Sequence, residues 1–240
     1  MSYRNRTTST WTSCACREPD RAVFIPLVDS LRCIRPHADT WLVASIERAD
    51  ERFIIEGTLG CPTCLAEYPV RSGVVYFNED AVRPPHREPS ESDAMRLAAA
   101  LDLTEPRMTA LLHGAWGAHA QLVRGFSPSQ LLLLNPPEGM ASGDGVSVLV
   151  SETAPLAQAS IDAVALDAPL NDALFASLRG SLRRGGRILA PVAVPVPPGF
   201  TELARDGEVW VARLDDAAIV SAPIMPTRRA HRSGGHPERA

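Results

Sequence analysis

The sequence contains no lysine, and all 24 of its basic residues are arginine. This absence excludes Schiff-base chemistry and a phosphate-binding loop ending in Lys-Ser/Thr, because both need the lysine amine. The net charge is −4, so the chain as a whole has no electrostatic attraction for nucleic acid. We therefore expect no nucleic-acid partner.

Long apolar runs are also missing. No stretch of about 18 apolar residues occurs, so the sequence predicts no membrane-spanning helix, although docking on a membrane complex stays open. The start of the chain lacks the apolar core of a signal peptide, and we therefore expect a cytoplasmic protein. The cysteines are five in number, namely Cys14, Cys16, Cys33, Cys61 and Cys64. An odd count argues against a disulfide framework and favours reduced thiols or a metal site.

The pattern of polar and apolar residues divides the chain into five segments. Residues 1–22 form a polar arm and residues 217–240 form a polar tail, and neither has the periodicity of a helix or strand. Residues 23–78 hold short apolar runs between turn residues, which predict a short helix followed by about three strands. Residues 79–92 are charged and proline-rich, so they are interpreted as a linker to a second unit, residues 93–216.

The second unit alternates between helical and strand patterns. Helices are predicted at 93–103, 115–126 and 172–185, and strands at 109–114, 130–137, 145–151, 161–168, 187–194 and 208–214. Apolar strands that alternate with helices predict a mainly parallel sheet covered on both faces. The expected class is thus α/β: a small α+β module followed by a shortened Rossmann-like sheet with flanking helices.

A metal site is predicted in the first unit. Cys61-Pro-Thr-Cys64 has the spacing of a zinc knuckle, and one such pair supplies half of a tetrahedral site. Cys33 lies where a second Cys-x-x-Cys would be expected, but its partner position is Pro36, which cannot ligate. His37 is one residue later and could bind through an imidazole nitrogen. The predicted zinc ligands are therefore Cys33, His37, Cys61 and Cys64.

Alternatives to this site remain. Cys14 and Cys16 could contribute, but their Cys-x-Cys spacing is too tight for a normal knuckle, and we interpret them as free thiols. A redox role for Cys61 and Cys64 would need the pair at a helix N-terminus, whereas it lies between two strand-like runs. The remaining alternative is that the metal has been lost and the fold is held by packing alone.

The knuckle belongs to a longer motif, G-x-L-x-C-P-x-C-x-x-x-Y-P-x-R-x-G. Its residues in this sequence are Gly57, Cys61, Pro62, Cys64, Tyr68, Pro69, Arg71 and Gly73. Through this motif, residues 26–77 resemble the small zinc-ribbon family that activates tRNA and protein methyltransferases. The resemblance implies a module that packs against a partner methyltransferase and carries no catalytic residue of its own.

Three stretches of the second unit carry another resemblance. They are QASIDAVALDAPL, LRGSLRRGGRILAPV with its Gly185-Gly186 turn, and PGFTELARDGEVWVARL. Their order resembles the fourth strand, the helix and fifth strand, and the terminal hairpin of class I S-adenosylmethionine-dependent methyltransferases, over residues 93–214. The resemblance implies a Rossmann-like fold with a cofactor site after the first two strands.

The sequence departs from that family where the cofactor would bind. Leu112 stands where an acidic residue is usual, and Trp116 fills a place that is usually small. The second strand ends in Asn135 instead of an acid, and an amide lacks the charge-assisted grip of a carboxylate. If S-adenosylmethionine bound, Gly114, Gly117 and Asn135 would contact it. We expect that it does not bind, and no catalytic residue is predicted.

Other titratable side chains have ordinary interpretations. The candidates for acid–base chemistry are His113, His119, Asp162, Asp167 and Asp172. We interpret the histidines as surface or core residues and the aspartates as caps of strands and helices. Similarly, Trp41, Trp116 and Trp210 are interpreted as core or interface aromatics.

Two functions follow from these patterns. The missing acids favour a non-catalytic accessory subunit that binds other protein subunits of a larger complex through both units. The alternative is a methyltransferase with its activator module fused to it.

Overall fold

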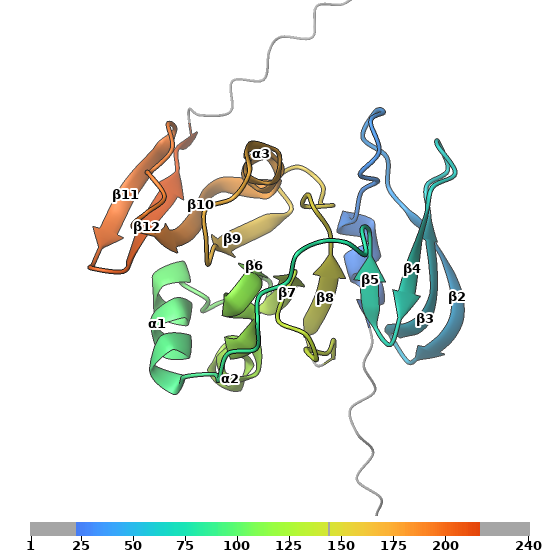
Figure 1. Ribbon diagram of the computed structural model, residues 1–240, viewed down its shortest axis with the longest axis horizontal. Helices are drawn as coiled ribbons and strands as arrows, with labels where there is room; N and C mark the ends of the chain where they lie inside the picture. Colours follow the sequence, from blue (N-terminus) through green and yellow to red (C-terminus); the bar gives the residue numbers. More distant parts are fainter. Residues whose placement is uncertain (1–22, 144, 217–240) are drawn as a thin grey trace, which may run out of the picture.

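The computed structural model describes residues 23–143 and 145–216 and shows a mixed α/β fold (Figure 1). Within these residues one sheet has the strand order β1-β3-β4-β5-β8-β7-β6-β9-β10-β12-β11, and β2 pairs with β3. The expected α/β class with a mainly parallel sheet in the second unit is thereby confirmed. The two predicted arms, with Cys14 and Cys16, lie outside the described residues.

The N-terminal module, residues 23–78, is a small antiparallel sheet. Its elements are β1 (Val23–Phe24), the 3-10 helix η1 (Ile25–Ser30), β2 (Val43–Asp50), β3 (Phe53–Gly60), β4 (Glu67–Arg71) and β5 (Val74–Tyr76). The predicted short helix is thus a 3-10 helix with Pro26 in its first turn, where a missing N–H costs nothing. It is followed by four strands instead of about three, because β4 and β5 pair across a tight turn.

The second unit contains the predicted helices and strands, with one additional strand before the last one and two corrections to the helices. Its elements are α1 (Glu91–Leu101), β6 (Thr109–His113), η2 (Gly114–His119), α2 (Ala120–Phe126), β7 (Gln130–Leu134), β8 (Val146–Val150), β9 (Ile161–Ala165), α3 (Asp172–Ser181), β10 (Leu182–Pro191), β11 (Phe200–Arg205) and β12 (Val209–Leu214). The helix predicted at 172–185 ends at Ser181, because Leu182 already pairs with Ile161 of β9. The helix predicted at 115–126 begins as the 3-10 helix η2.

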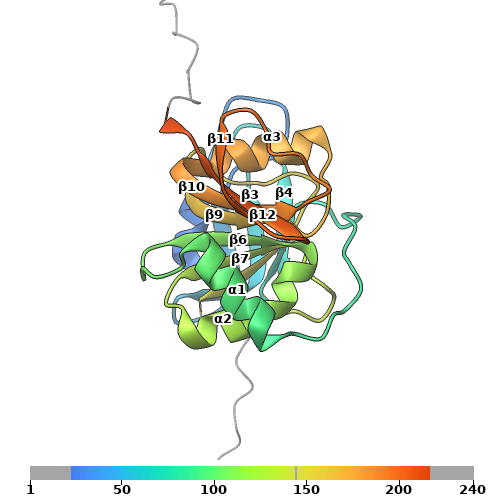
Figure 2. The same cartoon turned by 90° about the vertical axis from the view of Figure 1, so that its left-hand side faces the viewer.

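The central strands follow the order of a doubly wound sheet. Strands β8, β7, β6, β9 and β10 are parallel, and the antiparallel pair β11–β12 extends the sheet beyond β10. Helices α1 and α2 lie on one side of the sheet and α3 on the other (Figure 2). The strand order reverses between β6 and β9, and such switch points are where doubly wound folds bind ligands.

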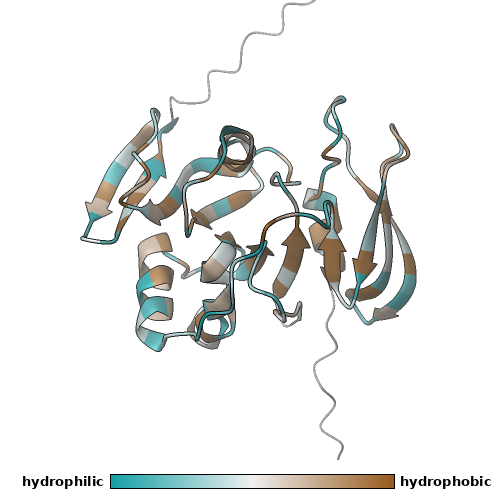
Figure 3. Cartoon of the chain, viewed as in Figure 1, coloured by the Kyte–Doolittle hydropathy of each residue, from teal (hydrophilic) through white to brown (hydrophobic). Residues whose placement is uncertain are grey.

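The N-terminal module joins this sheet directly. Strand β5 pairs in parallel with β8, with Val74 opposite Val148 and Val75 opposite Leu149. Apolar residues run through β5, β7 and β8 across the junction (Figure 3). Near-continuous apolar strands of this kind are buried on both faces. The module and the second unit therefore share one sheet, and residues of both units occur in each of its two apolar clusters.

Helix η1 fills a gap on one face of the second unit. In the described chain no helix connects β8 to β9, where a doubly wound fold usually has one. Leu31, at the end of η1, forms a β-bridge with Leu156, and Arg32 N–H donates to the Pro155 carbonyl at 2.9 Å. Leu27 and Leu31 are buried in the same cluster as strands β7 to β9. The module thus supplies apolar cover that the second unit lacks.

The segment between the units lies beside the loop after β7. It has no helix or strand from residue 77 to residue 90. Arg83 donates to the carbonyls of Pro136 and Pro137 at 2.7 and 2.8 Å. Among the described helices, none is long and apolar enough to cross a membrane.

Candidate functional site: a metal centre and a cleft with an occupied glycine turn

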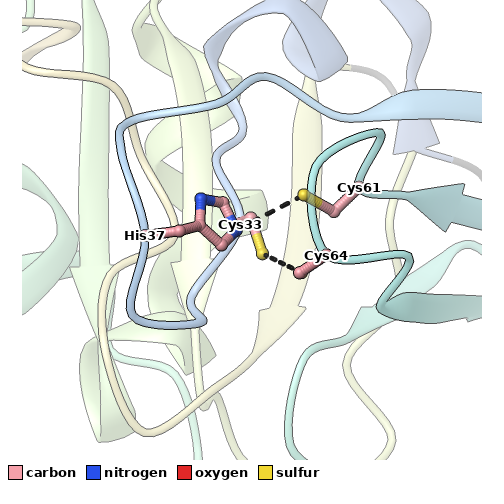
Figure 4. A group of neighbouring side chains, drawn as sticks. All are labelled: Cys33, His37, Cys61 and Cys64. Atoms are coloured by element: carbon pink, nitrogen blue, oxygen red, sulfur yellow. Dashed lines mark hydrogen bonds between the residues drawn. The ribbon is translucent and has the colours of Figure 1, made fainter.

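Two loops of the N-terminal module bring together the four predicted zinc ligands (Figure 4). Cys61 and Cys64 lie in the turn between β3 and β4, and Cys33 and His37 lie in the loop between η1 and β2. Their ligand atoms all lie within 4.8 Å of one another. Cys33 Sγ is 3.6 Å from Cys64 Sγ, and Cys61 Sγ is 3.4 Å from His37 Nε2.

These distances suit a tetrahedral zinc ion. Zinc–sulfur bonds of about 2.3 Å and zinc–nitrogen bonds of about 2.0 Å give tetrahedral edges of about 3.8 Å between sulfurs and about 3.5 Å between sulfur and nitrogen. The observed 3.6 and 3.4 Å lie close to both values. Three thiols and one imidazole form a donor set that is common in structural zinc centres. The protein supplies all four ligands, as in closed structural sites.

Local contacts join the two loops and fix the shape of the loop that carries Cys33 and His37. The Thr40 and Thr63 hydroxyl oxygens are 3.3 Å apart, and Cys33 N–H donates to the Thr40 carbonyl at 3.2 Å. His37 Nδ1 lies 2.6 Å from the Ala38 carbonyl, which acts as the acceptor. That bond places the proton on Nδ1 and leaves the Nε2 lone pair facing the sulfurs, as a metal ligand requires.

The thiols of Cys61 and Cys64 have different surroundings. Burial would raise the pKa of the Cys61 thiol, but the amides of Cys64 and Thr63 lower it below its ordinary value. The amide of Ala66 lowers the pKa of Cys64, but burial and the two neighbouring sulfurs raise it by more. Three sulfurs this close repel each other once ionised, so a bound cation is needed to stabilise them together as thiolates.

The second candidate region is a cleft of about 750 Å³ at the carboxyl ends of the parallel strands. It lies at the switch point between β6 and β9, where the sequence resemblance places a cofactor. Its polar lining comprises Asp80, His113, Asn135, Glu152, Thr153, Asp167 and Asn171. The three residues predicted to touch S-adenosylmethionine each have a partner within the protein.

Gly114 makes room for a side chain of the protein. It has φ +60°, and a Cβ at this position would collide with the carboxylate of Asp167. Asp167 Oδ2 accepts from the Ala115 amide at 2.7 Å, and Oδ1 accepts from His113 Nδ1 at 2.8 Å. The glycine turn that a cofactor would approach is therefore occupied by Asp167.

Gly117 and Asn135 also contact other parts of the protein. A Cβ on Gly117 would lie 2.6 Å from Cβ of Pro136, so this glycine allows η2 to pack on the loop after β7. The Asn135 side chain donates through Nδ2 to the Ser151 carbonyl at 2.7 Å, and its Oδ1 accepts from the Ser151 backbone amide at 2.9 Å. Asn135 is buried and ties the end of β7 to the end of β8. Its predicted position at the end of the second strand is correct, but both of its polar atoms are used.

The remaining titratable candidates do not form a single cluster. Burial would raise the pKa of Asp167, but hydrogen bonds from His113 and the Ala115 amide hold it below its usual range. His119 is fully buried, burial lowers its pKa, and its Nδ1 accepts from the Ser90 amide at 3.1 Å. Asp162 accepts from the Thr109 amide at 2.8 Å. His113 and Asp167 are thus brought together, and His119 is directed to the start of α1.

The tryptophans and Asp172 occupy ordinary positions. Trp210 is fully buried and Trp116 donates to the Leu166 carbonyl at 2.9 Å, whereas Trp41 is exposed. Asp172 lies in the first turn of α3, where a negative charge stabilises the helix dipole.

The similarity of this chain to known proteins is structural. No protein-family model matches the sequence, and no curated protein is detectably similar to it. Among solved structures the chain resembles methyltransferases. The similarity is distant.

Three examples show its extent. The 1,6-didemethyltoxoflavin-N1-methyltransferase of Burkholderia thailandensis is 16% identical, with a TM-score of 0.41 over 52% of this chain and 77% of that one. A protein of Corynebacterium glutamicum is 16% identical, with a TM-score of 0.40 over 54% and 83%. The geranyl diphosphate C-methyltransferase of Streptomyces coelicolor is 18% identical, with a TM-score of 0.36 over 41% and 42%. The chain thus spans less than half of that enzyme, and scores below 0.5 say nothing about activity.

Sequence reasoning missed the partners of the predicted residues. It assigned no role to Ser151 and interpreted Asp167 as a cap, although the position of Asp167 after β9 places it at the switch point. Tyr68 was part of the zinc-ribbon motif without a function, yet its hydroxyl lies 3.1 Å from Cys33 Sγ. Its inward position on β4, four residues after Cys64, is the signal that could have identified it.

Proposed function

We propose that this chain is a non-catalytic accessory protein, in which a zinc-stabilised module supports a methyltransferase-like unit and the two together bind other protein subunits. The observation that carries the proposal is the Asp167 carboxylate, which occupies the turn at Gly114. The hydrogen bonds between the Asn135 side chain and the Ser151 backbone also support it. They use both polar atoms of the side chain at the end of β7, which would otherwise hold a ribose.

The N-terminal module offers a surface for a protein partner. Three large apolar side chains near the zinc ligands are exposed: Trp41 at 65%, Val43 at 57% and Leu65 at 80%. Within the described residues β2 pairs only with β3, so its other edge has unpaired backbone groups. An exposed strand edge beside apolar side chains is a common protein-binding surface.

Calorimetric titration of S-adenosylmethionine into the zinc-loaded protein tests the catalytic question. The expected result is no binding tighter than about 1 mM, equivalent to roughly −4 kcal/mol, because Asp167 and Asn135 are already paired. Zinc content and circular dichroism of the same sample control for loss of fold. A micromolar dissociation constant would overturn the non-catalytic proposal.

Capture of partners from the source cells tests the accessory role. We expect the wild-type chain to retain a defined set of proteins, and a Trp41→Ser, Leu65→Ser double variant to lose them. Phe126→Ser is the matched control, because Phe126 is 47% exposed at the end of α2 in the second unit. A wild-type chain that migrates as a monomer in native extract would count against the proposal.

A methyltransferase with a fused activator module is the second candidate. The cleft of about 750 Å³ at the switch point favours it, because that volume is ample for a small ligand. The pairing of β5 with β8 also favours it, since a module that resembles methyltransferase activators packs on the methyltransferase-like unit of its own chain. The calorimetric titration separates the two candidates.

A further inference from the structure

The two halves of the zinc cluster differ in how their leading cysteines receive hydrogen bonds. Cys61 accepts from the amides of Thr63 and Cys64, which are two and three residues further along. This is the usual arrangement of a knuckle, in which the turn points backbone N–H groups at the sulfur. The sulfur is thereby given two donors without any side chain.

Cys33 has only half of that arrangement. The amide of Arg35, two residues later, donates to its sulfur. The residue three places later is Pro36, which has no N–H to donate. The proline at this position therefore supplies neither a metal ligand nor a hydrogen-bond donor.

The hydroxyl of Tyr68 lies where that donor is missing. It is 3.1 Å from Cys33 Sγ, and the Tyr68 side chain reaches it from strand β4. Tyr68 is 3% exposed, and its ring packs on Phe77 with ring centroids 4.6 Å apart. We propose that Tyr68 is a positioning residue of the zinc centre, whose hydroxyl donates to the Cys33 sulfur in place of the amide that Pro36 lacks.

This inference rests on the proposed zinc binding and deepens it. A thiolate that accepts two hydrogen bonds is oriented and carries less unshielded charge, so it is a better-placed ligand. Partners of metal ligands of this kind typically change metal affinity by about 10–100-fold when they are removed. The Tyr68 oxygen also accepts from the Ile34 amide, and the ring packs on Phe77. Phe at this position would preserve the packing of the ring and remove the hydroxyl.

The test is a double-mutant cycle on the full chain, with zinc affinity measured by competition with a chromophoric chelator. Tyr68→Phe is expected to weaken zinc binding by about 10–100-fold. Pro36→Ala restores a backbone amide, so adding it to Tyr68→Phe is expected to recover most of the loss. Tyr76→Phe is the matched control, because Tyr76 lies on β5 beneath Arg71 and outside the ligand cluster.

Cobalt(II) spectra give a second readout, since the sulfur-to-metal absorption band reports the bound thiolates, Cys33 among them. A shifted band in Tyr68→Phe that returns in the double variant supports the proposal. Equal zinc affinity in Tyr68→Phe and Tyr76→Phe would overturn it, and so would a loss that Pro36→Ala does not recover. Melting of the zinc-saturated variants controls for the fold. A wild-type chain without zinc or a cobalt band would refute zinc binding itself, a failure distinct from the other two.

Discussion

The Cys61→Ser variant is expected to lose its zinc and to unfold at markedly lower denaturant concentration than the wild type. Cys61 is buried, and its sulfur lies 3.4 Å from His37 Nε2 at the centre of the cluster. An ion that binds only the folded state stabilises it by about 4 kcal/mol when free zinc exceeds the dissociation constant a thousandfold. A serine hydroxyl is a poor zinc ligand, so most of that stabilisation would disappear.

The loss of stability in Cys61→Ser should extend from the module to the second unit. Strand β5 pairs with β8, and Leu27 and Leu31 of the module are buried in the same cluster as Leu149. We therefore expect one cooperative transition in urea, shifted as a whole, instead of separate melting of two units. The measurements are the zinc content and the urea midpoint of both proteins, with and without chelator.

The control for this experiment comes from the chain itself. Cys14→Ser and Cys16→Ser remove the two cysteines interpreted as free thiols, and both variants should keep stoichiometric zinc. If Cys61→Ser instead has the same midpoint as the zinc-loaded wild type, the cluster does not stabilise the fold through a metal.

Gly114→Ala is the second variant for which we expect a large loss of stability. Gly114 has φ +60°, a region that costs a residue with a Cβ about 1–2 kcal/mol. The new methyl group would also collide with the Asp167 carboxylate, and such overpacking costs about 1–3 kcal/mol. The free energy of unfolding should therefore fall by about 2–5 kcal/mol in urea titrations.

Gly139→Ala separates the two contributions. Gly139 also has a positive φ, +83°, but a Cβ there meets nothing within 4 Å. It should lose only the backbone term of about 1–2 kcal/mol, so the difference between the variants measures the collision. If Gly114→Ala costs no more than Gly139→Ala, Asp167 does not occupy the turn in solution, and a cofactor can approach the glycine turn.

The two variants bear on different halves of the proposal. Cys61→Ser asks whether a metal stabilises the module, and Gly114→Ala asks whether Asp167 occupies the glycine turn. A chain that passes both tests would be a zinc-stabilised protein whose methyltransferase-like unit has no room at the glycine turn. The partner-binding experiment would then decide what the unit is for.

Local patterns in the sequence predicted most of the elements and the four residues of the cysteine–histidine cluster. Apolar runs such as QLLLL and VSVLV predicted β7 and β8, because a strand buried on both faces needs apolar residues at every position. The spacing of Cys61 and Cys64 predicted a knuckle, because a short turn alone brings two sulfurs to one side. Zinc itself stays a prediction.

Other features depend on how distant segments pack. Asp167 and His113 are 54 positions apart, and they meet only because β6 and β9 are neighbours in the sheet. The Ser151 backbone reaches Asn135 because β7 and β8 end at the same edge. Likewise Tyr68 and Cys33 are 35 positions apart, and the pairing of β5 with β8 joins segments more than 70 residues apart in the chain.

The reason for this division is physical. Periodicity and turn spacing express constraints within a few residues of the backbone, and these are the same in any fold that contains the segment. Strand order and side-chain approach instead follow from the burial of the whole apolar surface, which no short stretch encodes. The residues of the cysteine–histidine cluster could thus be predicted from the sequence, whereas the Tyr68 hydroxyl beside Cys33 and the Asp167 carboxylate at the glycine turn became visible only in the folded chain.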